Sequence, residues 1–476
     1  MTKKELENQV VQLTNMVAEL QRKLDAAYEE ISELKEKLNK NSQNSSKPPS
    51  TDGYKKPNPR SLRKLSGKKQ GGQDGHKGHN LKIDTEPSEI IQYMPSTCRG
   101  CPQYEKCRER ACVCETRRVA DACLKIEVTA HQTLELNCPY HNAYLRGQFP
   151  EDVKASIQYG ENLQALVVAF NTVGAVSAKR IHELFGNIFG IPLSTGTVAN
   201  MVRACAENLA EIDEQLRTVV TGLEVAHFDE TGTRVENKLH WVHVASNRYF
   251  TYLYLSEKRG KIGMEEGSVL PSFHGIAVHD CWASYWKYAS AHGICCAHLL
   301  RELNGVQDNH PEQSWAKSFK KLLLDMKAVK DKALANRQEA LDAENIGLFE
   351  KRYDRILRKA YRQNPLPPKI PGKRGRQKRG KVRALIDRLQ NYKQAVCLFI
   401  KNFAVPFDNN QAERDLRMVK VKSKVSGCFR TSDGARYFLR IMSYVGTAKK
   451  QNVNPFHAIL KAISAKPEIF WTAQGC

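Results

Sequence analysis

Two aspartates each end a strand-like run of residues. Asp229 closes the run LEVAHFD, and Asp280 closes the run GIAVHD. An aspartate after a strand is ordinarily a turn or helix-cap residue. Two of them at matching positions of neighbouring strands, however, would emerge at the same edge of a sheet. Carboxylate oxygens are the hard ligands that Mg²⁺ and Mn²⁺ prefer, so the pair predicts a site for divalent metal ions.

A third acidic ligand would come from a helix that crosses this sheet edge. Glu413, in FDNNQAERDLRMVKVKSK, is the best candidate, because it lies about one turn inside a helix that Asp408 can cap. Taken alone, this segment is better explained by a surface ion pair between Glu413 and Arg417. Asp415 and Glu302 compete for the same role, and spacing does not choose among the three acids.

Three such carboxylates would suit the cleavage of a phosphodiester bond. The reaction places charge on the entering and the leaving oxygen, and two metal ions about 4 Å apart can stabilise both during an in-line displacement. Asp229, central in the expected sheet, would bridge the two ions. Asp280 and Glu413 would each hold one of them.

The elements around the two aspartates predict a mixed sheet. Residues 222–309 contain three successive strand-like runs and then strands that alternate with helices, an order typical of a ribonuclease H-like catalytic core. Two of the later elements are a helix over CWASYWKYA (281–289) and a strand over ICCA (294–297). Trp282 and Trp286, at helical spacing, are expected to pack in the core.

The remaining C-terminal segments complete a multidomain α/β protein. We expect a helical insertion with a basic loop over residues 310–384, the last part of the core with the Glu413 helix over 385–430, and a helical region over 431–476.

The basic loop carries eight Lys and Arg over Lys369–Arg383 without an acid. Solvation is the default explanation of such a run, and phosphate contact is the better one if the protein grips DNA. The residues expected to contact DNA are Lys373, Arg374, Arg376, Lys378 and Arg379, together with Arg417 on the Glu413 helix.

Residues 1–40 carry an apolar heptad with Glu and Lys between the apolar positions. This pattern predicts a coiled coil that forms a parallel dimer or a higher assembly; the alternative is a single helix packed on its own protein. The two apolar sets are Val10, Val17, Leu24, Ile31 and Leu38, and Leu6, Leu13, Leu20, Ala27 and Leu34. Residues 41–90, rich in Ser, Pro, Gly and Lys, are expected to form a disordered basic linker.

Residues 91–148 contain two short pairs of zinc-ligand types, Cys98 with Cys101 and Cys138 with His141. Two knuckles of this spacing supply four N or S ligands for tetrahedral Zn²⁺. A structural ion would stabilise a module too small to fold without it; buried reduced cysteines are the alternative. The ligand set stays open, because four further cysteines can replace a ligand or bind a second ion: Cys107, Cys112, Cys114 and Cys123.

Residues 155–216 predict a helical domain. Helices over ENLQALVVAFNTV, SAKRIHELFGNIFG and STGTVANMVRACAENL follow one another, and Ser194 is a suitable N-cap for the third. Two short helices joined by a glycine-containing turn resemble a helix-turn-helix, whose second helix enters the DNA major groove.

The composition favours a polyanionic partner. The 476 residues include 74 Lys and Arg against 51 Asp and Glu, a formal net charge of +23, and an excess of this size suits nucleic acid. The chain has no apolar run long enough to cross a bilayer, and MTKKELENQ lacks a secretory signal. We therefore expect no membrane partner and a cytoplasmic, nucleoid-associated protein.

The segment Cys296-Ala-His298, followed by Arg301, comes directly after the last expected strand. A core cysteine and a histidine at a helix start explain it in the ordinary way. The alternative is that His298 or Arg301 contacts the scissile phosphate beside the metal ions.

Several ordered motifs make the chain resemble the insertion-sequence-66 family of bacterial DDE transposases nearly end to end. They are NSSKPPSTDG, GGQDGHKGH, IPLSTGTVANMV, HFDETGTR, HDCWASY, CAHLLREL, DNNQAERDLR and TAKKQNVNPF. The resemblance implies catalytic roles for Asp229, Asp280 and Glu413, and so decides for Glu413 over its competitors. It favours accessory roles for His298 and Arg301. It also implies a zinc-finger-like module, although this chain departs from the usual pattern in its last ligand and its extra cysteines.

The resemblance implies a transposase that cleaves and transfers DNA strands at the ends of an insertion sequence. Its expected partners are the terminal repeats and target DNA, a second copy of the chain, and accessory proteins of the same element. Two alternatives share part of the pattern: a catalytically inactive dimeric DNA-binding regulator and a ribonuclease H-like DNA nuclease.

Overall fold

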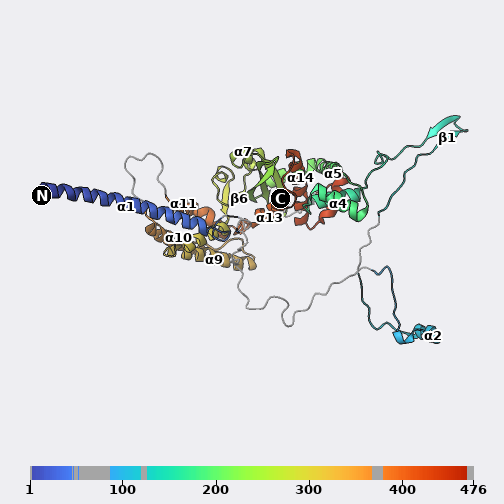
Figure 1. The fold of residues 1–476 in the computed structure, drawn as a ribbon, viewed down its shortest axis with the longest axis horizontal. Helices are drawn as coiled ribbons and strands as arrows, with labels where there is room; N and C mark the ends of the chain where they lie inside the picture. Colours follow the sequence, from blue (N-terminus) through green and yellow to red (C-terminus); the bar gives the residue numbers. More distant parts are fainter. Residues whose placement is uncertain are drawn as a thin grey trace. The chain divides into compact units, whose positions relative to one another are not determined.

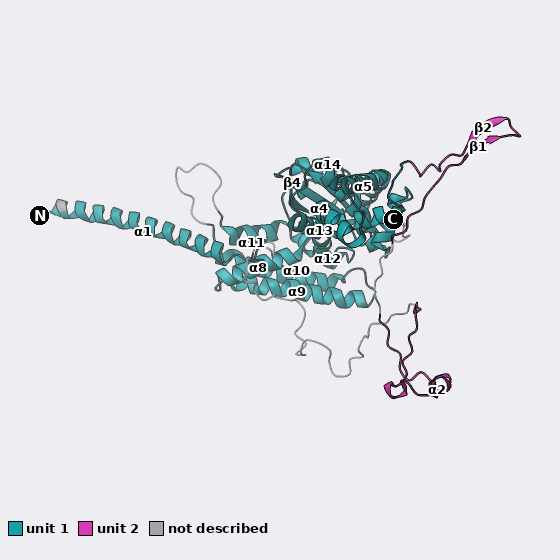
Figure 2. Ribbon diagram, turned by 45° about the vertical axis from the view of Figure 1, so that its right-hand side comes forward, with its two compact units in different colours: residues 1–60, 155–476 teal, residues 61–154 magenta. Residues whose placement is uncertain are grey.

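The computed structural model describes residues 3–45, 47, 52, 86–119, 126–366 and 379–468 (Figure 1). The chain divides into two compact units, residues 1–60 with 155–476 and residues 61–154 (Figure 2). The first unit combines a mixed sheet with many helices, which confirms the α/β class predicted from the sequence.

The sheet of the first unit has the strand order β5-β4-β3-β6-β7. β3 (Val225–Val235), β4 (Lys238–Ser246) and β5 (Thr251–Ser256) are antiparallel neighbours, and β6 (Ile276–His279) and β7 (Ala291–Ile294) extend the sheet parallel to β3. In the turn from β3 to β4, Glu236 and Asn237 have φ angles of 51° and 62°. Two-residue turns of this kind match the twist of paired strands.

Two elements beside the sheet differ from the sequence prediction. The helix predicted over 281–289 is a turn followed by the short 3₁₀ helix η4 (Tyr285–Lys287). Cys281 has a left-handed φ of 76°, and its N–H donates to Nδ1 of His279 (3.0 Å), so the chain turns before a helix can start. The strand predicted over 294–297 ends at Ile294, the last residue that pairs with β6, and a helix begins at Cys296.

Helices cover both faces of the sheet because its strands alternate between two apolar clusters. Ala226 and Phe228 pack with the helical segment before the sheet, whereas Val242 and Val244 pack with α13 (Asn410–Ser426). The preceding helices are α3 (Glu161–Asn171), α4 (Ala178–Phe189), α5 (Thr195–Asn208) and α6 (Ala210–Thr221). α7 (Lys261–Glu266) and α15 (Pro455–Ile463) also join this side.

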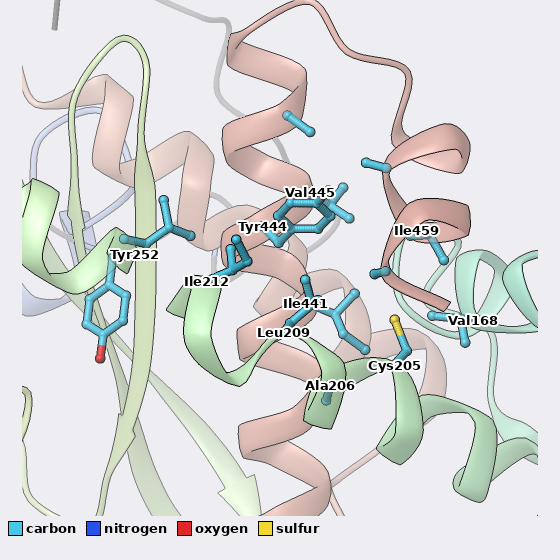
Figure 3. Packing of buried hydrophobic residues seen from close by; sticks show 14 of the residues in the cluster. Val168, Cys205, Ala206, Leu209, Ile212, Tyr252, Ile441, Tyr444, Val445 and Ile459 are labelled. Carbon is cyan, nitrogen blue, oxygen red and sulfur yellow. The ribbon is translucent and has the colours of Figure 1, made fainter. Parts of the chain in front are cut away.

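α14 (Ser432–Lys450) joins the helical segment to the sheet. Figure 3 shows Ile441, Tyr444 and Val445 of this helix among residues of α5 and α6, with Tyr252 of β5 beside them. The helical segment and the sheet therefore share one core.

A helical insertion separates β7 from α13. It consists of α8 (Cys296–Asn309), α9 (Ser314–Ala335), α10 (Ala343–Gln363), α11 (Lys381–Asn391) and α12 (Lys393–Lys401). Trp315, Phe319 and Tyr353 are fully buried at its centre. Among the described helices, none has the length and apolar character needed to cross a membrane.

α1 (Lys3–Asn39) is a single long helix whose C-terminal end contacts α8. Asn39 donates to Asn309 (3.0 Å), and Glu36 pairs with His310 (3.0 Å). The large apolar side chains of its heptad positions remain 46–85% exposed. The coiled coil stays a prediction, and the exposed stripe leaves its apolar surface available for a partner helix.

Residues 41–45, predicted as the start of the basic linker, form an ordered turn instead. Asn44 and Ser45 are buried, and the Ser45 hydroxyl donates to the backbone oxygen of Asn41 (2.6 Å). Side-chain hydrogen bonds of the Asn and Ser residues replace regular backbone pairing here, which local composition does not reveal. Residues 53–85 of the predicted linker lie outside the described residues.

The second unit contains η2 (Ser96–Cys98), α2 (Tyr104–Arg110) and a hairpin of β1 (Glu135–Cys138) and β2 (Ala143–Arg146). Among its described residues, 86–119 and 126–154, none is buried. These residues therefore have no apolar core of their own.

Candidate active site

The register of the sheet brings Asp229 and Asp280 to the same edge. β3 and β6 are parallel neighbours in which His227 pairs with Val278, and each aspartate comes two residues later. Because side chains alternate between the faces of a strand, the Asp229 carboxyl group lies on the face opposite to Phe228, and Asp280 directly follows the last residue of β6.

The Asp229 carboxyl group lies in a buried and negatively charged environment. Burial raises its pKa well above the ordinary value, and the charges of Glu230, Asp280 and Glu413 raise the pKa further. A hydrogen bond from the backbone N–H of Glu230 to Oδ1 (2.8 Å) acts in the opposite direction. The structure thus brings the three sequence-predicted acids into one electrostatic neighbourhood.

Asn409 fastens the start of α13, the helix of Glu413, to the sheet. This asparagine is 1% exposed. Its Nδ2 donates to the backbone oxygen of Phe228 (2.8 Å), and its Oδ1 lies 2.8 Å from Nδ1 of His227. Its backbone N–H donates to Sγ of Cys295 (3.1 Å), directly before α8. One uncharged side chain therefore joins the strand of Asp229 to the helix of Glu413.

Cationic and neutral groups of α8 face Glu413. Arg301 Nη2 lies 3.3 Å from Oε1 of Glu413, and His298 Nε2 lies 3.9 Å from the same oxygen. Burial and the charges of Arg301 and Arg388 lower the pKa of His298 to about 3. The imidazole is therefore neutral at pH 7, so Arg301 forms the ion pair with Glu413 and His298 does not.

The two competing candidates for the third acid are engaged elsewhere. Asp415 forms an ion pair with Lys450 (2.8 Å), and both side chains are nearly buried. Glu302 forms an ion pair with Arg388. Arg417 is exposed on α13. The N-cap residue of this helix is Asn409, without a side-chain cap hydrogen bond, and not the predicted Asp408, which instead accepts from the N–H of Asn410 (3.1 Å).

Sequence reasoning missed a fourth acid beside the site. Glu230 points to the opposite face from Asp229, where its carboxylate accepts from the Tyr285 hydroxyl and pairs with Arg259 (2.7 Å). The Arg259 guanidinium stacks between the rings of Trp241 and Trp282, 4.8 and 4.4 Å from their centroids. The adjacent Asp-Glu pair in a predicted strand could have indicated this second acid. Side chains alternate between the two faces of a strand, so Glu230 must lie on the face opposite to Asp229.

The three acids have the donor chemistry of a divalent-cation site, because they are all carboxylates. Within the described residues, however, no group of three or more His, Cys, Asp or Glu side chains is placed so that it could hold a metal ion. Asp229 is nevertheless close to both Asp280 and Glu413. Two ions that share Asp229 would each need only one further carboxylate and water ligands, which suits Mg²⁺. They would also neutralise the accumulated negative charge.

Comparison with known proteins identifies the family of the chain. A family model described as "Transposase IS66 family" matches residues 156–437, more than half of the chain, including all three acids. This chain belongs to the IS66 transposase family. A second model, of a family of unknown function, matches residues 1–82. No curated protein matches the chain.

The four predicted zinc ligands of this IS66-family chain occur as two local pairs. Cys138 Sγ lies 3.2 Å from Nδ1 of His141, and the backbone N–H of Cys101 donates to the oxygen of Cys98 (3.1 Å). The described residues contain no cluster that unites the pairs. Of the extra cysteines, Cys107, Cys112 and Cys114 are exposed, and Cys123 lies outside the described residues.

The predicted helix-turn-helix of the transposase corresponds to α4 and α5. As expected, Ser194 caps α5: its hydroxyl accepts from the N–H of Thr197 (2.9 Å). One side of α5 is buried, and Asn200 and Arg203 are exposed on the other.

The DNA-contact residues predicted in the basic loop fall mostly beyond the described part of the transposase. Arg379, at the end of the loop, forms an ion pair with Asp387 (3.0 Å). Lys373, Arg374, Arg376 and Lys378 lie outside the described residues.

Replacing Asn409 with Ala should loosen α13 at its start. Each buried hydrogen bond stabilises by about 0.5–1.5 kcal/mol, so the loss of both Asn409 side-chain bonds should cost about 1–3 kcal/mol. Backbone amides in the first turns of α13 should exchange with deuterium about ten- to a hundredfold faster, measured by mass spectrometry. Asn410→Ala, one residue away and exposed, is the control. Equal exchange in the two variants would show that Asn409 does not fasten the helix.

Proposed function

We propose that this chain is a DNA transposase that cleaves and joins DNA strands at the ends of an insertion sequence with the help of two divalent metal ions. The observation that carries the proposal is that Asp280 and Glu413, from a neighbouring strand end and a distant helix, lie close enough to Asp229 for their charges to raise its pKa. Membership of the IS66 transposase family supports it.

The strand order supports a ribonuclease H-like core. Three antiparallel strands followed by two strands parallel to the first, with the order β5-β4-β3-β6-β7, carry the two aspartates on adjacent central strands. α8 to α12 would then be an insertion between the last strand and the helix of the third acid.

In this proposal Asp229, Asp280 and Glu413 would together hold two Mg²⁺ or Mn²⁺ ions. When bound, the ions stabilise charge on the entering and leaving oxygens and lower the pKa of the nucleophile, so that no general base is needed. The nucleophile is water in the first reaction and the freed 3′-hydroxyl in the second.

The residues around the acids have separate tasks. Arg301 orients the Glu413 carboxylate through its 3.3 Å contact and offers its remaining N–H groups to the scissile phosphate. His298, neutral at pH 7, lies beside the same oxygen without competing for its charge. Asn409 holds α13 against β3 without adding a charge.

Recognition of DNA would be divided among the other parts of the chain. α5 would enter the major groove through its exposed side, and the basic loop and Arg417 would contact phosphates. The exposed apolar stripe of α1 would pair two copies as a coiled coil. Accessory proteins of the same element would act with this assembly.

Strand transfer by the purified full-length chain tests the chemistry. With Mg²⁺ and DNA of the element ends, Asp229→Asn, Asp280→Asn and Glu413→Gln should each abolish cleavage and joining, because each removes a ligand of an ion. EDTA should stop the wild-type reaction, and Mn²⁺ should support it. Asp408→Asn, in the same segment as Glu413, should stay active.

Other outcomes of this experiment separate the alternatives. Full activity in any one of the three variants would remove that residue from the site. Specific DNA binding by a wild-type chain that never cuts would indicate a regulator, and cutting without joining would indicate a nuclease. Retained DNA binding by the variants, measured without metal, shows that they are folded.

DNA binding should depend on the two expected contact regions in different ways. Arg203→Ala on α5 should reduce discrimination between element ends and unrelated DNA. Replacing the loop cations with Ala should weaken binding to all DNA and flatten the salt dependence by about 0.9 per lost contact. Titrations at several salt concentrations measure both effects. An unchanged salt dependence of binding would show that the loop does not contact phosphates. Unchanged discrimination between element ends and unrelated DNA would show that α5 does not recognise bases.

A structural zinc ion would supply what the second unit lacks, since none of its described residues is buried. We therefore propose that Cys98, Cys101, Cys138 and His141 bind one ion. The purified chain should contain about one equivalent of zinc, measured by elemental analysis, and Cys101→Ser should lower this content. Cys112→Ser is the control. A zinc-free chain with normal DNA binding would contradict the proposal.

A further inference from the structure

A cavity of about 580 Å³ lies between the end of α1, the turn at 41–45, α8 and α11. Its size is within the range of about 300–1,000 Å³ typical of ligand sites. It is outside the acid cluster, and no part of the proposed metal chemistry uses it.

One wall of the cavity exists because a turn packs closely on α8. The backbone oxygen of Asn44 lies so near Gly305 that a Cβ at this glycine would be 2.5 Å from it. Asn304 Nδ2 donates to the oxygen of Gln43 (3.2 Å), and Asn44 Nδ2 donates to the oxygen of Asn39 (2.9 Å). These contacts hold the turn against α8, and Lys40 and Lys47 flank the turn in the sequence.

The cavity lining has more cationic than acidic residues. Lys40, Lys47, Lys381 and Arg388 line the cavity, against the two carboxylates of Glu36 and Glu302. Lys381 is paired with Glu36 and Arg388 with Glu302, so these two cations are held in place. Lys40 and Lys47 have no acidic partner within the described residues. The excess of positive charge suits an anion.

Part of the cavity lining is apolar. Val306 of α8 and Val382, Ala384 and Leu385 of α11 contribute aliphatic surface. Aliphatic surface together with cationic groups matches a nucleotide, whose base has an apolar face and whose phosphate is anionic. A duplex presents its phosphates on a wide, convex surface and would offer the cavity phosphates without a free base.

α8 connects the cavity to the acids. Arg301 contacts Glu413, and the next residue, Glu302, lines the cavity. A strand that leaves the acids along this helix would therefore meet the cavity.

We propose that this cavity binds an unpaired nucleotide of the DNA strand that passes the three acids. The inference rests on the proposed function, because that function supplies a DNA strand at Glu413. It adds a single-strand site that holds an end while the acids act.

Binding of DNA with and without an overhang tests the proposal. The full-length chain is titrated in EDTA with a labelled duplex carrying a short single-stranded overhang, and with the blunt duplex of the same sequence. The double variant Lys40→Gln/Lys47→Gln should bind the overhang duplex more weakly. The slope of log affinity against log salt should be flatter by about 1.4, because each phosphate contact on a single strand accounts for about 0.7. Binding of the blunt duplex should change little.

The matched control is Lys35→Gln/Lys37→Gln, which removes the same amount of charge from the C-terminal end of α1, outside the cavity. Equal losses in the two double variants, or no loss in the cavity variant, would overturn the proposal. The assay contains no metal, so loss of strand transfer leaves its outcome unaffected. Conversely, a chain that transfers strands normally but binds overhang and blunt duplexes equally well would contradict only the proposed role of the cavity.

A second measurement uses the unaltered chain. Overhang DNA should protect Lys40 and Lys381 from acetylation by an amine-reactive ester, relative to Lys35 and Lys37, whereas blunt duplex or a free mononucleotide should protect them less. Equal protection by blunt duplex would show an ordinary electrostatic surface and would also overturn the proposal.

Discussion

Mutual repulsion among neighbouring, partly buried carboxylates is the constraint on which the centre of this structure depends. Burial and three neighbouring acids all raise the pKa of Asp229, so the acids oppose their own assembly. The fold overcomes this with rigid parts: two strands in fixed register and a helix fastened by Asn409. Charges of opposite sign stand at the periphery, with Arg301 on Glu413 and Arg259 on Glu230. The centre is left with negative charge that a cation can satisfy.

The two layers of the sheet divide this task. On one face, Arg259 neutralises Glu230, and the indole rings of two tryptophans hold the Arg259 guanidinium in place. Asp229, on the other face, forms no ion pair with any residue that the structure describes. Cation–π contacts are strongest when the cation has lost water, so the tryptophan pair keeps Arg259 on its own side. At the start of α13 the uncharged Asn409 side chain joins the helix to β3, so this attachment adds no positive charge beside Asp229.

The sequence pattern predicted those elements whose formation depends on residues close together in the chain. Alternating apolar residues gave the strands around Asp229 and Asp280, and Ser194 gave a helix start. Glu413 could not be chosen by spacing, because Asp415 lies on the same helix and only a distant lysine, Lys450, removes it from contention. The helix predicted at 281–289 was wrong because a left-handed residue and a histidine acceptor redirect the chain. The turn at 41–45 was missed because its partners lie on α8, about 260 residues away.

The attachment of α1 by its C-terminal end has a mechanical consequence. The helix has 37 residues, so at about 1.5 Å per residue it is a rod about 55 Å long. If two such helices paired side by side in the same direction, the sheets of both copies would lie at the same end of the helix pair. Opposite pairing would put the sheets at the two far ends. The relative direction of the two α1 helices in the dimer would thus determine whether two cuts are made beside each other or far apart.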